Sequence, residues 1–186
     1  GRSINVSEND VLIAETSTLR FPGIVDAVLA GTSSRFLTAV AALFDSTTII
    51  DGEAALRSRP MSDLHDALEA LGAEVLHLGE EGHLPVSISR GSLVGGDIHI
   101  AGNVSSQFIS ALMLIGPMLD EGLTVHVTGP LISRSYVEMT ADVMRSFGVS
   151  VDIDESTISV SSGSYKGREY MIEPDYSSAA FPLVAI

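Results

Sequence analysis

The segment TSSRF at residues 32–36 constrains the fold of this 186-residue chain more than any other, because the chain repeats it. A second copy, VSSQF, occupies residues 104–108, and a less regular third copy, YSSAAF, occupies residues 176–181. Each step from one copy to the next is 72 residues long. Self-similarity at a fixed period is typical of a fold built from stacked copies of one unit. Since this period exceeds that of the common solenoids, we expect each copy to be a subdomain of several strands and two helices.

Elements of the same kind follow the first two copies in the same order. Apolar runs at residues 36–44 and 108–115 predict a helix without a polar face, which must be buried on all sides. Amphipathic patterns at residues 61–71 and 136–147 predict a second, half-buried helix in each unit. Short strands are predicted at residues 9–14, 47–52, 75–78, 85–89, 97–101, 124–129, 149–153, 157–161 and 170–172. The sequence therefore predicts an α/β (α+β) fold of repeated units, with helices inside and sheets outside.

The composition narrows the range of partners. With 45% hydrophobic and 18% charged residues the chain is globular and long enough to bury a sizeable core. No apolar run approaches the roughly 18 residues that a membrane span needs, so we expect no membrane contact and a cytoplasmic location. A net charge of −14 without a basic stripe argues against nucleic acid as a partner. For an anionic ligand, local arginines and helix N-termini must therefore supply the attraction.

Several kinds of chemistry have no support in the residues. The chain contains no cysteine, which excludes disulfides, thiolate nucleophiles and Cys-ligated zinc. Its five histidines show no metal-ligand spacing, and its carboxylates scatter without a recognisable acid–base pair. From the residues alone we therefore expect no metal, and we can nominate no general acid–base pair.

The strongest candidate site is GNVSSQ at residues 102–107, at the predicted start of the second apolar helix. The hydroxyls of Ser105 and Ser106, the amide of Gln107 and the free N–H groups of the first turn can bind a phosphate. An equally good interpretation is that the serines only cap the helix. The copies differ at the residue after the serine pair, which is Arg35, then Gln107, then Ala179. We expect function to enter at this difference.

Three further positions allow a structural and a binding interpretation. Gly31 either relieves a tight turn, the interpretation that local sequence favours, or lets a ligand approach the backbone. Arg59 precedes Pro60, which suits the first position of a helix, so its guanidinium is expected at the helix mouth. There it can bind a carboxylate or phosphate, unless it is a surface arginine paired with an acid. Ser135 and Glu138 have the spacing of a capping box, a structural role that the spacing favours over a ligand role.

Together these residues resemble one family of enzymes. The segments concerned are AGT with Arg35, RPM at 59–61, GNVSSQF at 102–108, LISRSY at 131–136 and EPDYSS at 173–178. In this order and spacing they are similar to the 5-enolpyruvylshikimate-3-phosphate synthase family over about residues 25–186. The resemblance implies an inside-out α/β barrel of repeated βαβαββ units, as in enolpyruvyl transferases. It also implies two domains, of which residues 1–172 form the first and 173–186 begin the crossover into the second.

The resemblance further implies an activity and a set of binding residues. Members transfer the enolpyruvyl group of phosphoenolpyruvate to the 5-hydroxyl of shikimate 3-phosphate, release phosphate and need no cofactor. The resemblance implies two groups of binding residues. The first group would bind shikimate 3-phosphate and consists of Ser105, Ser106, Gln107, Ser133 and Tyr136. Phosphoenolpyruvate would be held by the second group, Gly31, Arg59 and Gln107, with Arg35 as a supporting residue.

The resemblance also implies that the chain alone holds half a site. The family's Lys-Ser motif, its second domain and the acid–base residues of that domain have no match here, so we expect no turnover by the chain alone. We also expect a monomer. Two alternatives stay open. The sister enzyme that acts on UDP-N-acetylglucosamine usually has a loop cysteine, which this chain lacks. A non-catalytic repeat domain would carry a broad exposed apolar patch, whereas the loops here are polar.

Overall fold

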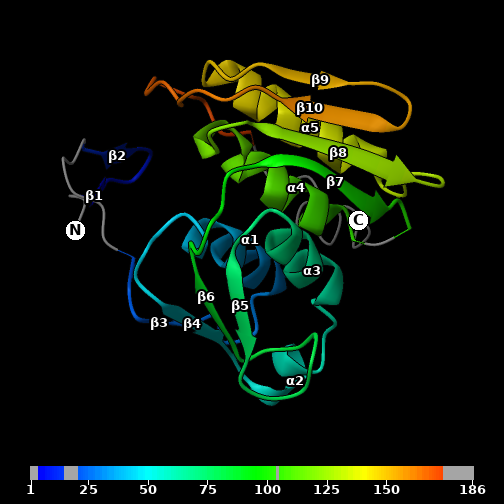
Figure 1. Cartoon of the computed structure of the whole chain (residues 1–186). Coiled ribbons are helices and arrows are strands. Elements are labelled where there is room, and N and C mark those ends of the chain that lie inside the picture. Colours follow the sequence, from blue (N-terminus) through cyan, green and yellow to red (C-terminus); the bar gives the residue numbers. More distant parts are fainter. Residues whose placement is uncertain (1–3, 15–20, 104, 174–186) are drawn as a thin grey trace, which may run out of the picture.

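The computed structural model describes residues 4–14, 21–103 and 105–173. Two units of the same βαβαββ type follow one another along the chain (Figure 1). The first consists of β3 (Ile24–Asp26), α1 (Gly31–Ala41), β4 (Thr48–Asp51), α3 (Ser62–Ala70), β5 (Glu74–His77) and β6 (Val86–Ser89), with the short α2 (Ala54–Arg57) before α3. The second consists of β7 (Gly96–Ala101), α4 (Ser106–Ile115), β8 (Leu123–Thr128), α5 (Arg134–Ser146), β9 (Val151–Ile153) and β10 (Thr157–Val160), with a 3-10 turn, Gly116–Met118, after α4.

The two units have identical sheet topology. The strand order is β3-β4-β6-β5 in one sheet and β7-β8-β10-β9 in the other. The first pair of each sheet is parallel, with Val25 opposite Ile50 and Ile98 opposite Val125, and the remaining pairs are antiparallel. The repeat inferred from the first two copies of the motif is therefore confirmed. The third copy, at residues 176–181, lies outside the described residues.

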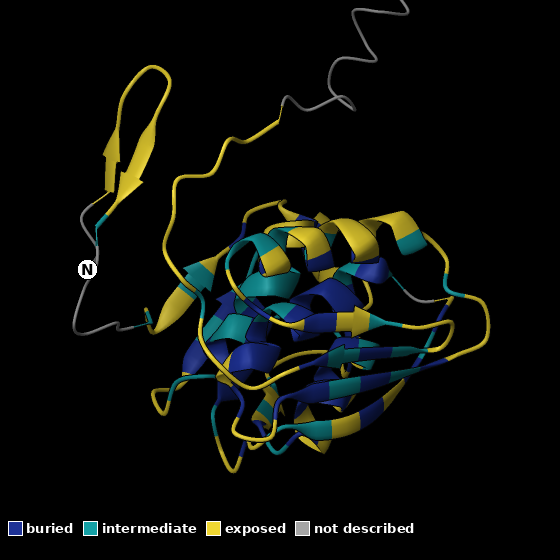
Figure 2. Ribbon diagram, turned by 90° about the horizontal axis from the view of Figure 1, so that it is seen from above, coloured by how far each residue is buried: buried dark blue, intermediate teal, exposed yellow. Residues whose placement is uncertain are grey.

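The prediction of helices inside and sheets outside is confirmed for α1, α3 and α4. In Figure 1, α1, α3 and α4 occupy the space between the two sheets, and Figure 2 shows that this interior is buried. α1 packs on α4, α4 packs on α5, and α3 contacts strands of both sheets. Strands alternate accordingly: in β8, Leu123, Val125 and Val127 face the core and the residues between them do not. Within the described residues the two sheets are separate and form no closed barrel.

The two apolar helices differ in how completely they are covered. Buried residues make up most of α4, so the prediction of burial on all sides is confirmed there. It is wrong for α1, where Phe36, Leu37 and Val40 are only half-buried. For Phe36 the reason is that its side of α1 borders an open cavity, which it helps to line, instead of a packed element.

Two element boundaries also differ from the predictions. Pro60 does not begin a helix, because Met61 caps α3 and its buried side chain and its N–H bond to Gly82 O (2.8 Å) turn the chain first. The predicted strand at residues 170–172 is absent from the described structure. Met171 and Ile172 are 88% and 80% exposed there, so their apolar character reflects no packed sheet position.

A small hairpin of β1 (Ile4–Val6) and β2 (Val11–Ile13) lies apart from this body in both views (Figures 1 and 2). It falls partly within the predicted strand at residues 9–14. All its apolar side chains are at least half exposed. The hairpin therefore adds little to the core.

The described segments contain neither a candidate membrane span nor a candidate metal cluster. None of their helices is both long enough and apolar enough to cross a membrane. None of their His, Asp and Glu side chains gather in a group of three or more that could hold a metal ion.

Candidate functional site

The guanidinium group of Arg59 lies beside the first turn of α1. A Cβ at position 31 would stand 2.6 Å from Arg59 Nη1, so any other residue there would shift the end of this arginine side chain. Arg59 lies between α2 and α3, where its N–H donates to Leu56 O (3.0 Å) and its side chain stays exposed. The first N–H groups of a helix lack intrahelical acceptors and carry the positive end of its dipole. Gly31 thus permits close approach of a cation to a helix N-terminus, which the turn interpretation does not explain.

One turn further along α1, Arg35 reaches across to the second unit. Its Nη1 donates to Gln107 Oε1 (2.5 Å), and its Cζ lies 4.9 Å from the centroid of the Phe108 ring. Its Nε is buried without a hydrogen-bond partner among the described residues. Arg35 and Gln107 are equivalent residues of the two repeats, 72 positions apart. The position at which the copies differ is therefore the position at which they touch.

The electrostatics of this region favour an anion. Burial, and then the charge of Arg59, lower the pKa of Arg35 from its ordinary value. In the part of the chain that the structure describes, no carboxylate pairs with Arg35 or Arg59. Arg57, by contrast, forms a 2.8 Å ion pair with Asp51. The surface-arginine interpretation thus describes Arg57, whereas Arg35 and Arg59 form a local positive site in an acidic protein.

The start of α4 serves both as a cap and as a cavity wall. Ser105 is the N-cap residue, and its Oγ accepts a hydrogen bond from Gln107 N (3.3 Å). The capping interpretation is thus correct for Ser105. Ser106 and Gln107 instead line a cavity. Capping thus involves Ser105, whereas a ligand role for Ser106 and Gln107 stays a prediction.

The cavity lies between α1, α4 and α5 and has a volume of about 470 Å³. Such a volume is within the range of small-molecule pockets. Its lining combines hydroxyl and amide groups with apolar side chains: Thr32, Phe36, Ser106, Gln107, Ser110, Leu114, Tyr136, Met139, Thr140 and Val143. The cavity thus reaches the first turn of all three helices.

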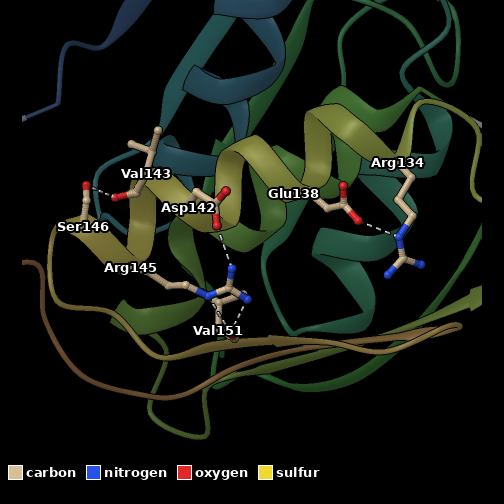
Figure 3. A network of polar contacts seen from close by, with 7 residues as sticks. All are labelled: Arg134, Glu138, Asp142, Val143, Arg145, Ser146 and Val151. Atoms are coloured by element: carbon tan, nitrogen blue, oxygen red, sulfur yellow. Dashed lines mark hydrogen bonds and ion pairs between the residues drawn. The ribbon is translucent and has the colours of Figure 1, made fainter. Parts of the chain in front are cut away.

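The start of α5 places Tyr136 but not Ser133 at this cavity. Tyr136 lines the cavity and is 55% exposed. Ser133 is an exposed N-cap residue with left-handed backbone (φ 60°) and no capping hydrogen bond. The predicted capping box is absent, because α5 begins at Arg134 and the Glu138 carboxylate accepts from Arg134 Nε (2.8 Å) instead (Figure 3). The guanidinium of Arg134 is thus already paired with a carboxylate.

Polar contacts hold α5 against its neighbours. Near its C-terminal end, Arg145 donates from Nε and Nη2 to Val151 O (3.0 and 2.7 Å) and from Nη1 to Asp142 (2.8 Å) (Figure 3). In the middle of the helix, the hydroxyls of Thr140 and Ser110 share a 2.8 Å hydrogen bond between α5 and α4. Sequence reasoning did not select these two residues. Ser110 was detectable as the lone hydroxyl in the apolar run at 108–115.

The structure therefore brings most of the predicted residues together. Ser106, Gln107 and Tyr136 share the cavity, and Arg35 joins Gln107 to the positive site at Gly31 and Arg59. Two predicted residues stand aside from the cavity lining: Ser105, which caps α4, and Ser133, which is exposed.

Two βαβαββ units with helices inside and sheets outside are the architecture of the enolpyruvyl transferase fold, and this fold defines the class of the protein. The sequence model of one family, EPSP synthase (3-phosphoshikimate 1-carboxyvinyltransferase), matches residues 2–186. The chain belongs to this family. The EPSP synthase of Acinetobacter baumannii is similar in structure, with a TM-score of 0.77 and 26% identity over 99% of this chain and 41% of that one.

Curated relatives agree. The 3-phosphoshikimate 1-carboxyvinyltransferase of Methanothermobacter thermautotrophicus is 48% identical over 152 residues, which are 82% of this chain and 36% of that protein. The enzyme of the same name from Methanocorpusculum labreanum is 43% identical over 163 residues, 87% and 38% of the two chains. The pentafunctional AROM polypeptide of Candida tropicalis is 41% identical over 83% of this chain and 11% of its own length. The chain thus spans well under half the length of these relatives.

Proposed function

We propose that the protein transfers the enolpyruvyl group of phosphoenolpyruvate to the 5-hydroxyl of shikimate 3-phosphate and releases phosphate. The observation that carries this proposal is the pair of arginines at the N-terminus of α1, which have no acid partner among the described residues and are joined through Arg35 to Gln107. Both substrates are small polyanions, which such a site attracts in a chain of net charge −14. Membership of the EPSP synthase family supports the same reaction.

The proposed roles divide between the two units. Shikimate 3-phosphate would bind at the starts of α4 and α5, through Ser105, Ser106, Gln107, Ser133 and Tyr136. Phosphoenolpyruvate would bind at the start of α1, through Gly31, Arg59 and Gln107. The position of Gln107 where the two units meet supports a place for it in both groups. The Ser105 hydroxyl accepts from the α4 backbone, so its own O–H stays available to donate.

The contribution of this chain to the reaction is binding and orientation. Holding the two anions side by side brings the reacting hydroxyl and the enol carbon together before a bond forms. The site described above contains no carboxylate or histidine that would move a proton. We propose that a second domain of the same protein supplies that chemistry. On this basis residues 1–172 are the shikimate-3-phosphate-binding domain, 173–186 begin the crossover, and the protein is a cytoplasmic monomer.

A two-dimensional NMR titration of the 186-residue chain tests this function. Millimolar shikimate 3-phosphate should shift the amides of residues 105–107 and 136, and phosphoenolpyruvate those near Gly31 and Arg59. Arg59→Met should weaken the second titration about tenfold, because a charge-assisted contact is lost. Arg57→Met is the matched control, since it removes the same charge from an exposed ion pair and should change nothing.

Three results would contradict the proposal. Shifts with UDP-N-acetylglucosamine alone would indicate the sister enzyme. Equal shifts with inorganic phosphate and both substrates would indicate a site without substrate selectivity. Phosphate release by the isolated chain would contradict only the proposed need for a second domain, because the acid–base groups would then be present in these 186 residues.

A further inference from the structure

The side-chain amide of Gln107 is held from the neighbouring unit. Gln107 stands in the first turn of α4 and is half-buried at the cavity wall. Its Oε1 accepts from Nη1 of Arg35 on α1. A guanidinium has only donors, so the amide atom that faces it must be the oxygen. The two N–H groups on Nε2 are then left for other partners.

Packing, and not an ion pair, holds Arg35 in this position. Its guanidinium lies against the Phe108 ring of α4, with Cζ 4.9 Å from the ring centroid. Within the described ranges it has no carboxylate partner, and its Nε has no partner of any kind. Burial and the nearby charge of Arg59 both disfavour a cation here. Salt-bridge stabilisation therefore does not account for an arginine at this position.

We propose that Arg35 is a positioning residue, which fixes the Gln107 amide so that its Nε2–H groups donate to an oxyanion in the cavity. This inference rests on the proposed function, because it requires the ligand to reach Gln107. Carboxylate and phosphate oxygens are acceptors, so a Gln amide helps only when its nitrogen faces them. An amide that can flip would present Oε1 half the time and repel the anion. Hydrogen bonding of Oε1 to a cation also polarises the amide and strengthens its N–H donors.

Arg35 can also attract an anion directly through its charge, and a double-mutant cycle separates the two effects. If Arg35 acts through Gln107, Arg35→Met weakens binding about tenfold in the wild type, as expected for one charge-assisted contact. In a Gln107→Met background the same change has no further effect. If the charge acts directly, the losses of affinity in the two single variants multiply to about a hundredfold in the double variant.

The experiment measures the affinity and the side-chain amide resonances of Gln107 in the 186-residue chain. The ligands are phosphoenolpyruvate and shikimate 3-phosphate, with inorganic phosphate as a third probe. Ligand should shift the resonances of the Nε2–H₂ pair of Gln107 in the wild type. The shift should be smaller in Arg35→Met and close to the wild-type shift in Arg35→Lys, because lysine keeps a donor for Oε1. Arg57→Met, with the same change of net charge, should bind like the wild type.

The outcomes distinguish the inference from the function beneath it. Tight binding by Arg35→Met with an unchanged Gln107 shift would overturn the inference and leave the proposed function in place. Multiplying losses in the double variant would do the same, since the charge would then act directly. A wild-type chain that binds none of the three ligands would overturn both. If Arg35→Met does not fold, the Arg35→Lys arm decides: a full loss of the Gln107 shift in that folded variant contradicts positioning by a donor.

Discussion

Gly31 matters because it has no Cβ atom. Arg59 Nη1 occupies the space of a Cβ at this position, so Gly31→Ala must push the guanidinium away from the start of α1. We expect the variant to fold normally and to bind phosphoenolpyruvate about tenfold more weakly, because a charge-assisted contact is displaced. Isothermal titration or NMR would measure this. Gly23→Ala is the control, since a Cβ there meets nothing within 4 Å; unchanged affinity in Gly31→Ala would contradict the role given to Arg59.

His65 makes stability depend on pH. This fully buried residue of α3 shares a 3.1 Å hydrogen bond with His77, and its Nε2 has no partner among the described residues. Burial, followed by the charges of His77 and His83, lowers its pKa to about 4. The unfolded chain, with a His pKa of about 6.5, therefore binds more protons between these values. The contribution is complete above about pH 6.5 and is lost as the pH falls toward 4.

We expect the wild type to lose about 2 kcal/mol of unfolding free energy between about pH 7.5 and pH 5 through this one group. His65→Gln should lack that part of the pH dependence, and His99→Gln, at an exposed strand position, should keep it. Urea unfolding at the two pH values measures the difference. The same slope in His65→Gln as in the wild type would assign the effect to other groups.

Among the elements, the equivalent helices α1 and α4 begin differently. α1 has Ala30 at its N-cap and no side-chain cap, whereas Ser105 caps α4 through the N–H of Gln107. Ser105→Ala should therefore reduce the free energy of unfolding by about 1 kcal/mol. Ser133→Ala, at an N-cap without a side-chain hydrogen bond, should change it much less. Chemical denaturation compares the two variants, and equal losses would mean that the Ser105 bond contributes nothing.

The stability of the whole molecule comes from the core that the two units form between their sheets. The core combines residues of both units, among them Ile50 and Leu64 of the first and Ile109 and Met144 of the second. The β1–β2 hairpin contributes exposed residues only. Deleting residues 1–14 should shift the melting temperature by less than about 2 °C, because a lone two-stranded hairpin is marginal in water. A calorimetric scan checks this, and a large drop would show that the hairpin packs on the body.

Much of the architecture was predictable because its signals are local. Apolar runs, amphipathic periods and the 72-residue repeat identified both units, and the motif residues Ser106, Gln107 and Tyr136 line one cavity. The errors came from competition beyond the local pattern. The Ser135–Glu138 spacing matched a capping box, but Glu138 pairs with Arg134. Pro60 matched a helix start, but the buried Met61 delays α3 to Ser62.

The sequence by itself determined the repeated unit, the order of its helices and strands, and where the two copies differ. These properties depend on hydrophobic periodicity and turn chemistry, which act over a few residues. Only the tertiary structure decided that Arg35 meets Gln107, that Arg59 occupies the space beside Gly31, and that α1 borders a cavity. Such contacts join residues from different elements, and the way one unit packs on the other determines which side chains meet.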